Sequence, residues 1–387
     1  MLMGLFGLII LLVAYTYVGY PLCVWLMAHF VNVKSPKKDD DVDIHEVGRV
    51  SVIIPAHNEA QYLRTKIQSI LTQSAVEYIF EIVIADDGST DNTAEVINYL
   101  NDPRIKLITL SRQGKAAALN TAVELSCGDL LVLTDADNLW QQGTLQALLV
   151  PFLNEKVGAV GGKLEFPAVH QQGTSWGDRY YRLFEGWLRQ QEDKAGCLIN
   201  LDGALLAIRK RLWQPVPAGV TDDFFISTAA LVAGYQLVWT PHAIVEDHST
   251  SKPRQQFQRR VRITLRGLQS LWARRSLLNI HQLKLAWALL SHKILRRILP
   301  LFILLLLPLN LMLLTYGWLF KAFFIIQLMG YLIMVLVLLL PGFHWPKPCI
   351  FIAFLIQQLV AMSWACILFV SGHRVLQWTP DAGRQVK

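Results

Sequence analysis

The sequence is poor in cysteine and in charged residues. Its five cysteines are an odd number in a chain of 387 residues, and no two of them have C-x-x-C spacing. These absences exclude a disulfide scaffold and a zinc ribbon. With 17% charged and 53% hydrophobic residues, the chain is also too apolar to be disordered.

Two nucleotide-binding signatures are absent as well. There is no G-x-x-x-x-G-K-[ST] loop, and no G-x-G-x-x-G follows the first expected strand. ATP hydrolysis on a P-loop and NAD chemistry on a Rossmann fold are therefore disfavoured.

Charge is almost absent from both ends of the chain. Residues 1–30 contain no Asp, Glu, Lys or Arg, and residues 301–373 contain only Lys321 and Lys347. A helix over 1–30 is long enough to cross a hydrocarbon core of ~30 Å, and a cleaved signal peptide is disfavoured because no basic residues precede its long apolar run. Three further spans are expected over 298–320, 322–340 and 349–370.

The stretch of chain between these ends has the composition of an ordinary soluble domain. We therefore expect an N-terminal transmembrane helix (1–30), a linker (31–48), a soluble domain (49–250), basic helices at the membrane interface (251–297), about three transmembrane helices (298–371) and a tail (372–387).

Basic residues beside the spans predict the orientation of the chain. They follow the first span and precede the second, at Lys34, Lys37, Lys38, Lys293, Arg296 and Arg297. Both groups place the soluble domain in the cytoplasm and the protein in the inner membrane. Four spans would place the basic tail on the opposite side, so either the tail departs from the rule or one apolar segment does not cross.

From Arg49 onward, short β-rich runs alternate with helical periods. The pattern predicts strands over 50–55, 80–85, 105–110 and 129–134 and helices over 59–72, 90–100 and 115–125. Single helices between strands predict right-handed crossovers and an α/β fold with a mainly parallel sheet. Ligands bind beyond the carboxyl ends of the strands in such a sheet.

Polar clusters follow three of the expected strands. They are Pro55-Ala56-His57-Asn58-Glu59, Asp86-Asp87-Gly88-Ser89-Thr90-Asp91 and Thr134-Asp135-Ala136-Asp137-Asn138. Each alone is compatible with a turn or a helix cap, but three at one sheet edge indicate a binding site. Two carboxylates one residue apart suit Mg²⁺ or Mn²⁺, with phosphate oxygens completing the coordination.

With the further motif Gly114-Lys115-Ala116-Ala117-Ala118-Leu119-Asn120, these clusters resemble those of family 2 glycosyltransferases of the membrane-bound polysaccharide-synthase type, over about residues 48–300. The resemblance implies the nucleotide-diphospho-sugar transferase (GT-A) fold, a nucleotide-sugar donor with uridine as the family default, and Mg²⁺ or Mn²⁺. It also assigns residues to the donor site: Pro55, Ala56, Glu59, Asp86 and Asp87 to the nucleoside, Lys115 and Asp135 to the diphosphate, and Asp137 with Asp135 to the metal.

The segment from Gly219 to Phe225 matches the acidic pair that supplies the general base in this family. Asp223 corresponds to its second carboxylate, and Asp222 precedes it. An acceptor hydroxyl is a poor nucleophile and needs a positioned carboxylate to take its proton. Capping of a helix by Asp222 is the alternative role. The single displacement implied by the resemblance inverts the anomeric centre.

The family's Q-x-x-R-W element is present only in part. Gln256 and Arg259 have its spacing, but Arg260 stands where Trp is expected; a second register pairs Gln255 or Gln258 with Arg262. This departure weakens the expectation of a long polymer and leaves a single-sugar transferase acting on polyprenyl phosphate or another lipid as the alternative. We expect Arg259, Arg260 and Arg262 to face phosphate or lipid headgroups, and Asp202 and Gly203 to face the acceptor.

Charge is divided unevenly between the two parts of the chain. Residues 1–248 hold 19 basic and 28 acidic residues, whereas residues 249–387 hold 17 basic and one acidic. Beside membrane spans, the basic stretch is expected to meet diphosphate and anionic lipid, and a nucleic-acid partner is disfavoured. Glycan or lipid-linked acceptors and export proteins are the other partners considered.

Aromatic residues recur at helical spacing between the metal motif and the acidic pair. They are Trp176, Tyr180, Tyr181, Phe184 and Trp187. Core packing near the membrane is the favoured interpretation, and a platform on which acceptor sugars stack is the alternative.

Overall fold

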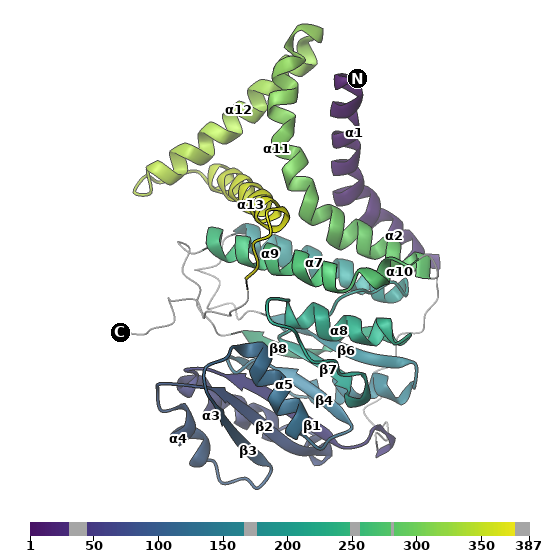
Figure 1. The fold of residues 1–387 in the computed structure, drawn as a ribbon, viewed down its shortest axis with the longest axis vertical. Coiled ribbons are helices and arrows are strands. Elements are labelled where there is room, and N and C mark those ends of the chain that lie inside the picture. The colour runs from purple at the N-terminus through teal and green to yellow at the C-terminus, as the bar shows by residue number, and fades with distance from the viewer. Residues whose placement is uncertain (31–44, 166–175, 248–255, 280–281, 376–387) are drawn as a thin grey trace.

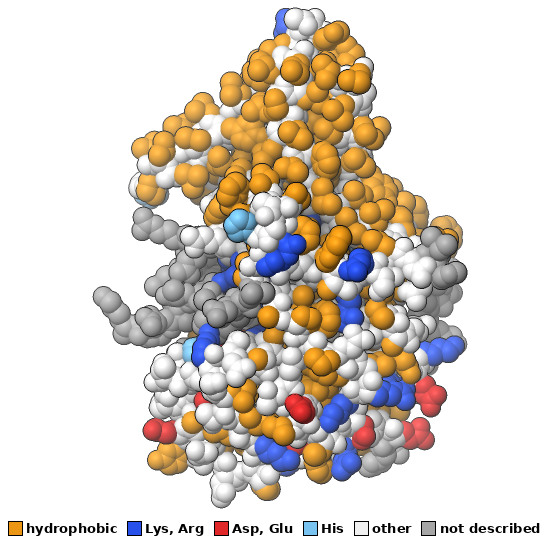
Figure 2. Space-filling model, viewed as in Figure 1, with side chains coloured by type: hydrophobic (Ala, Val, Ile, Leu, Met, Phe, Trp, Pro, Cys, Tyr) orange, Lys and Arg blue, Asp and Glu red, His pale blue; other side chains and the backbone are white. Residues whose placement is uncertain are grey.

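The computed structural model describes residues 1–30, 45–165, 176–247, 256–279 and 282–375. It consists of an α/β domain and a group of long apolar helices on one side of that domain (Figure 1). Two amphipathic helices, α7 (Trp176–Lys194) and α9 (Gln256–Ala273), lie between the two parts. Figure 2 shows hydrophobic side chains covering the apolar helices, whereas most charged side chains lie on the α/β domain.

One eight-stranded sheet forms the centre of the α/β domain. Its strand order is β3-β2-β1-β4-β7-β6-β8-β5. The strands are β1 (Val50–Ala56), β2 (Ile79–Asp87), β3 (Ile105–Leu110), β4 (Leu130–Thr134), β5 (Asn138–Trp140), β6 (Val157–Glu165), β7 (Leu205–Arg209) and β8 (Gln236–Asp247). Six strands run in one direction, and only β5 and β7 oppose them. The expected mainly parallel α/β sheet is confirmed.

Helices cover both faces of the sheet. On one face lie α3 (Ala60–Leu71), α4 (Thr93–Asn98) and α6 (Thr144–Leu149), and on the other lie α5 (Lys115–Leu125) and α8 (Asp222–Val232). Side chains of β1 alternate between the two cores, as the pleat requires: Val52 and Ile54 belong to one and Ile53 to the other. The second core continues into α7, α9 and the membrane-proximal helix α2 (Tyr20–Phe30).

The parallel pairing of β1 with both β2 and β4 determines where the site lies. Ala56 of β1 pairs with Asp86 of β2, and β4 ends at Thr134 on the other side of β1. The carboxyl ends of three neighbouring strands therefore meet at one edge. This arrangement confirms that the three polar clusters converge.

Four helical segments are long and apolar enough to cross a membrane, among the residues that the structure describes. They are Leu2–Phe30, Leu283–Met312, Trp318–Leu339 and Lys347–Val370. The first comprises α1 (Leu2–Ala14), a π-helical turn at Tyr15–Gly19 and α2; the second comprises α10 (Leu283–Ala288), a π-helical stretch and α11 (Arg296–Met312); the others are α12 and α13.

The second of these segments lies earlier in the chain than expected. It begins at Leu283 instead of residue 298 and ends at Met312, and α12 begins at Trp318. The chain breaks at Gly317 and not at Lys321, because Gly317 has a φ of 150°, which side chains disfavour. The basic residues near 293–297 consequently lie inside this helical segment.

Polar side chains join the apolar helices to α7. The hydroxyl of Tyr20 on α2 donates to Glu192 Oε1 at 2.5 Å, and His292 Nδ1 lies 2.6 Å from the same oxygen. Arg296 pairs with Glu185, about two turns before Glu192 on the same face of α7. Buried polar groups need partners, so these contacts fix α2 and α11 against the α/β domain.

Helix α13 (Lys347–Val370) packs along α9 and returns the chain to the α/β domain. Gln358 accepts a hydrogen bond from Arg260 of α9, and Cys366 Sγ lies 3.2 Å from the carbonyl oxygen of Arg297. Beyond the helix, the Val375 amide donates to Gln269 Oε1 of α9 at 3.2 Å. Figure 1 shows α13 next to α9, on the domain side of the apolar helices.

A buried carboxylate holds the four parallel strands together at the opposite end from the site. Glu81 of β2 accepts hydrogen bonds from Ser51 Oγ at 2.6 Å, the Cys127 amide at 2.5 Å and Lys106 Nζ at 2.7 Å. These partners belong to β1, the turn before β4, and β3. The bonds to the ionised form outweigh burial and lower the pKa of Glu81.

Replacement of Glu81 by Gln is expected to lower the melting temperature. The side-chain NH₂ group of the glutamine is a donor and would face the donors that now bind the carboxylate. A buried polar group left without its partner lowers the free energy of unfolding by about 1–3 kcal/mol. Thermal unfolding of the full chain measures the effect. Glu77→Gln, at an exposed position just before β2, is the control, and an equal effect of the two changes would contradict the role of Glu81.

Candidate functional site

A pocket of about 290 Å³ opens at the sheet edge where the three clusters meet. Its walls come from the ends of β1, β2 and β4, the start of α5, the loop before α8, and α9. The lining residues are Pro55, Ala56, His57, Glu59, Asp87, Lys115, Asp135, Ala136, Asp137, Thr221, Arg259, Arg262, Ile263 and Arg266. Seven expected donor-site residues thus share one pocket with two of the expected arginines.

The first two clusters are bound directly to each other. Asn58 has a φ of 58°, a conformation that Asn tolerates better than most residues. In this position the side-chain Oδ1 of Asn58 accepts a hydrogen bond from the backbone amide of Thr90 at 2.8 Å, and the backbone amide of Asn58 donates to Ser89 Oγ at 2.9 Å. These bonds shorten α4, which begins at Thr93 and not near residue 90 as expected. Asn58 was not among the expected site residues.

The two adjacent aspartates of the second cluster have different places. Asp87 lines the pocket, and its carboxylate accepts the amides of Gln113 and Gly114 at 2.7 and 2.9 Å. It therefore fixes the start of α5 and the position of Lys115. Asp86 does not line the pocket; it is buried and accepts the Ser89 amide at 2.9 Å, which stabilises the turn.

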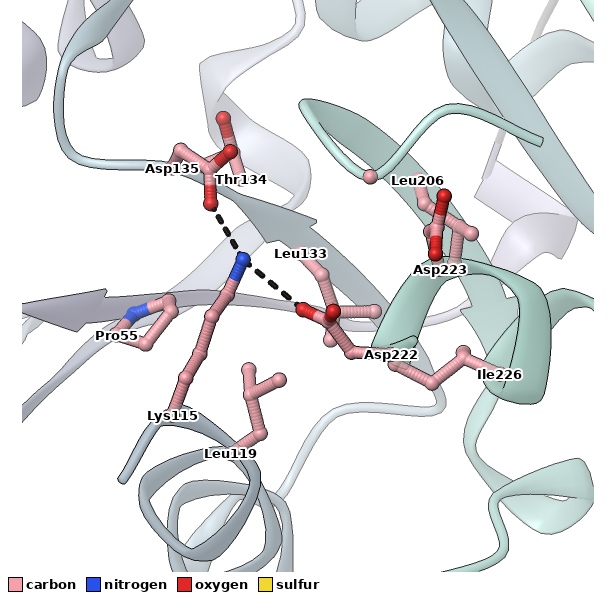
Figure 3. Close-up of a pocket in the computed structure, with 11 residues that line it drawn as sticks. Pro55, Lys115, Leu119, Leu133, Thr134, Asp135, Leu206, Asp222, Asp223 and Ile226 are labelled. Atoms are coloured by element: carbon pink, nitrogen blue, oxygen red, sulfur yellow. Dashed lines mark hydrogen bonds and ion pairs between the residues drawn. The ribbon is translucent and has the colours of Figure 1, made fainter. Parts of the chain in front are cut away.

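Lys115 joins the third cluster to the acidic pair. Figure 3 shows its side chain between two carboxylates: Nζ lies 2.8 Å from Asp135 Oδ1 and 2.9 Å from Asp222 Oδ2. Burial opposes the charge, but the two carboxylates outweigh it and raise the pKa of Lys115. The ammonium in turn lowers the pKa of Asp222 against the effect of burial. Lys115 is therefore an ion-pair bridge and not an exposed helix residue.

Asp223 lies in a narrow niche next to the main pocket. The niche is lined by Pro55, Lys115, Leu119, Leu133, Thr134, Asp135, Gly203, Leu206, Asp222, Asp223 and Ile226. Burial, aided by the charge of Asp222, raises the pKa of Asp223 to about 6. A carboxylate with this pKa is ionised near neutral pH and is also a stronger base than an ordinary Asp.

Gly203 and Asp202 flank this niche. A Cβ on Gly203 would lie 3.1 Å from Asp223 Cβ, so a small residue keeps space beside the acidic pair. Asp202 pairs with Arg189 of α7 at 3.1 Å. Arg189 was not expected at the site, because its sequence neighbourhood resembles any amphipathic helix.

One face of α9 closes the donor pocket. Arg259, Arg262 and Arg266 line it, at spacings of three and four residues that share a helical face. Arg260 lies about 100° around the helix from Arg259 and donates to Gln358 of α13. It does not line the pocket, and its expected contact with phosphate or lipid headgroups stays a prediction. The side chain of Gln256 lies outside the described residues. Arg266 was missed because it falls beyond the Q-x-x-R spacing.

The loop before the acidic pair is fastened to the same helix. The Thr221 amide donates to Ser270 Oγ of α9 at 2.8 Å, and the hydroxyl oxygens of the two residues lie 3.0 Å apart. Gln269 Nε2 donates to the Gly219 carbonyl at 3.0 Å, and Arg266 donates to that of Val220. Helix α9 thus sets the position of the pocket arginines and of the acidic pair together.

The aromatic residues of α7 are only partly described. Phe184 and Trp187 have ring centroids 6.1 Å apart, and the Arg296 guanidinium lies 5.4 Å from the Phe184 ring. Phe184 packs against the core that α7 shares with α9, which agrees with the favoured core interpretation. The side chains of Trp176, Tyr180 and Tyr181 lie outside the described residues.

The carboxylates in the pocket fit a hard divalent cation in their donor chemistry. Asp135 and Asp137 both line it, and Mg²⁺ and Mn²⁺ prefer such oxygen ligands. Within the described part of the chain no group of three His, Cys, Asp or Glu side chains could hold a metal. Diphosphate oxygens would therefore complete the coordination, as is usual for nucleotide-bound metals.

Residues 51–211 match the model of the family "Glycosyl transferase family 2". Over these residues the chain is similar to family 2 glycosyltransferases. The match includes all three clusters and Lys115 but ends before Asp222, Asp223 and α9. The acidic pair and the arginine face of α9 therefore lie outside the residues that match the family.

Curated proteins that this chain is similar to include polysaccharide synthases. Chondroitin synthase of Pasteurella multocida (strain Pm70) is 38% identical over 119 residues, which are 30% of this chain and 12% of that protein. Poly-beta-1,6-N-acetyl-D-glucosamine synthase of Staphylococcus aureus (strain COL) is 25% identical over 221 residues, 54% of this chain and 52% of that protein. The chain thus spans only part of the length of these relatives.

A solved structure shares the fold of this chain along nearly its whole length. Mannosyltransferase PcManGT from Pyrobaculum calidifontis, in complex with GDP-Man and Mn²⁺, aligns with a TM-score of 0.68 and 24% identity, over 95% of this chain and 99% of that chain. The expected GT-A fold with flanking apolar helices is confirmed.

The pKa of Asp223 predicts how transfer depends on pH. A base must be ionised, so kcat/KM should rise with pH through a limb near 6. Asp222→Asn removes the negative charge that raises this pKa, and the limb should move to lower pH. Initial rates of nucleoside diphosphate release between pH 4.5 and 9 locate this limb in the wild-type protein and in Asp222→Asn. Asp102→Asn, a carboxylate paired with Arg104 far from the pocket, should leave the limb in place; a limb unmoved by Asp222→Asn would contradict the assignment.

Proposed function

We propose that the protein is an inverting, metal-dependent glycosyltransferase that moves a sugar from a nucleoside-diphosphate donor, UDP-linked by preference, to a growing polysaccharide. One observation carries this proposal: the donor pocket and the Asp223 niche share Pro55, Lys115 and Asp135. A sugar attached to a diphosphate in the pocket would present its anomeric carbon toward the niche, where an acceptor hydroxyl could approach Asp223.

The reaction is a single displacement. Asp223 takes the proton of the acceptor hydroxyl, and the oxygen forms a bond to the anomeric carbon as the bond from that carbon to the diphosphate breaks. Because attack and departure occur on opposite faces, the anomeric configuration inverts. Arg259, Arg262 and Arg266 stabilise the leaving diphosphate electrostatically.

Asp135 and Asp137 would hold Mg²⁺ or Mn²⁺ against the diphosphate. The bound metal would neutralise charge that develops on the leaving group. Lys115 keeps Asp135 oriented through its 2.8 Å ion pair. The presence of Mn²⁺ in the complex of the mannosyltransferase with the shared fold supports a metal here.

The acceptor has two candidates. Polysaccharide synthases among the relatives support a growing glycan. Two observations favour a lipid-linked acceptor such as polyprenyl phosphate. Arg260 replaces the expected Trp and contacts α13, and Asp202, next to Gly203 of the niche, pairs with Arg189 of α7. The length of products made from labelled donor separates the two, and parallel incubations with UDP- and GDP-sugars identify the nucleotide.

We also propose that the protein is integral to the inner membrane with its catalytic domain in the cytoplasm and its C-terminus on the same side. The contact of Val375 with Gln269 supports this, since α9 borders the donor pocket. On this view α13 lies along the membrane boundary beside α9 and does not cross. The basic tail then agrees with the positive-inside rule.

Asp223→Asn is expected to abolish transfer while donor binding persists. Loss of a general base lowers turnover by about 10²–10⁴-fold, whereas the pocket that binds the nucleotide keeps its own residues. Product formation in membranes and nucleotide binding by the purified full chain measure the two properties. Asp102→Asn is the control, and wild-type turnover by Asp223→Asn would refute the base assignment.

Tags at the two ends of the chain should face opposite sides of the membrane. A tag after Lys387 should be cleaved by protease on the side of the catalytic domain, together with a reference tag inserted in residues 31–48. A tag at Met1 should be cleaved only from the other side. Sealed vesicles of both orientations provide the measurement. Protection of the C-terminal tag whenever the reference tag is cleaved would show that α13 crosses.

A further inference from the structure

A lysine buried beneath the metal motif has no part in the reaction described so far. Lys66 lies on the inner face of α3, and its side chain is fully buried. Its Nζ donates to Thr134 Oγ1 at 2.7 Å and to Asn138 Oδ1 at 2.5 Å, and the Trp140 ring centroid lies 5.4 Å away. A buried ammonium is costly unless it is bonded in this way.

The two partners of Lys66 flank the metal motif. Thr134 is the residue before Asp135, and Asn138 is the residue after Asp137. Both partners are buried. One cation therefore holds both ends of the three-residue loop that carries the two carboxylates.

The same cluster reaches the acceptor-facing segment. Asn138 Nδ2 donates to the Ala204 carbonyl at 3.0 Å, and Thr134 Oγ1 lies 3.1 Å from the same oxygen. Ala204 follows Gly203, which borders Asp223. The polar cluster thus connects the metal loop on one side to the niche of the base on the other.

We propose that Lys66 is a positioning residue that holds the Asp135–Asp137 loop in the geometry that binds a divalent cation with the donor diphosphate, and that aligns this loop with the acceptor segment at Ala204. The proposal rests on the function proposed above, in which these carboxylates bind the metal. Residues that orient metal ligands through hydrogen bonds typically change metal affinity by 10–100-fold when they are replaced. Burial lowers the pKa of Lys66, and Asp135 and Asp137 oppose that shift.

Lys66→Met provides the first test because Met fills a similar volume without a donor. We expect Mn²⁺ affinity, measured by electron paramagnetic resonance of free Mn²⁺ with the full-length protein and saturating UDP or GDP, to fall by about 10–100-fold. Leu63→Ala is the matched control: Leu63 is fully buried one turn earlier on the same helix face. It should lower the melting temperature while Mn²⁺ affinity stays within about threefold.

Thr134 provides a second test if Lys66→Met does not fold. Thr134→Val keeps the shape of the side chain but removes the hydroxyl that accepts from Lys66, and we expect a loss of Mn²⁺ affinity of about tenfold or more. Thr134→Ser keeps the hydroxyl and should retain most of the affinity. Equal affinities for the Val and Ser variants would overturn the positioning role.

The outcomes distinguish the two proposals. If the wild-type protein binds Mn²⁺ with UDP or GDP and Lys66→Met binds it equally well, or if Leu63→Ala loses as much affinity, Lys66 is only a structural residue. If the wild-type protein binds no Mn²⁺ with either nucleotide, the proposed metal-dependent function is itself wrong, and the role of Lys66 falls with it.

Discussion

The site depends on the ion pairs of Lys115 with Asp135 and Asp222. One ammonium connects the loop after β4 with the first turn of α8 at distances of 2.8 and 2.9 Å. These elements are far apart in sequence and on different parts of the sheet edge. Without a cation between them, two carboxylates would repel each other in a half-buried site. Asp87 completes the arrangement, because it fixes the backbone at the start of α5 from which Lys115 extends.

Helix α9 has a comparable role on the membrane side. Three arginines on one face meet the pocket, and a neighbouring face contacts α13 through Arg260. The loop of Thr221, which leads into the acidic pair, is bound to the same helix. The pocket, the loop that leads into the acidic pair and helix α13 therefore all contact one helix. For this reason residues from both the acidic and the basic part of the chain line a single pocket.

The sequence allowed the sheet and the three clusters to be predicted, because parallel strands bring their carboxyl ends together whatever their exact length. Rotation of α9 about its axis could not be predicted, so the sequence did not separate Arg260, which contacts α13, from Arg259 and Arg262, which line the pocket with Arg266. Lys66 gave no signal, since a lysine among the apolar residues of α3 reads as an exposed position. The break at Gly317 was also missed: a charged residue marked the turn in the sequence, whereas backbone conformation decides it in the structure.

The contact between Arg260 and Gln358 has a consequence for how the protein senses its surroundings. Helix α13 contacts α9 on one side, and in the orientation proposed above its other side would face lipid, so a displacement of α13 by the bilayer would act on α9. A change in bilayer thickness or lateral pressure that displaces α13 shifts α9 and, within one helical turn, the guanidinium groups of Arg259 and Arg262. Turnover should therefore vary with acyl-chain length of the host lipid even when every substrate is soluble in water.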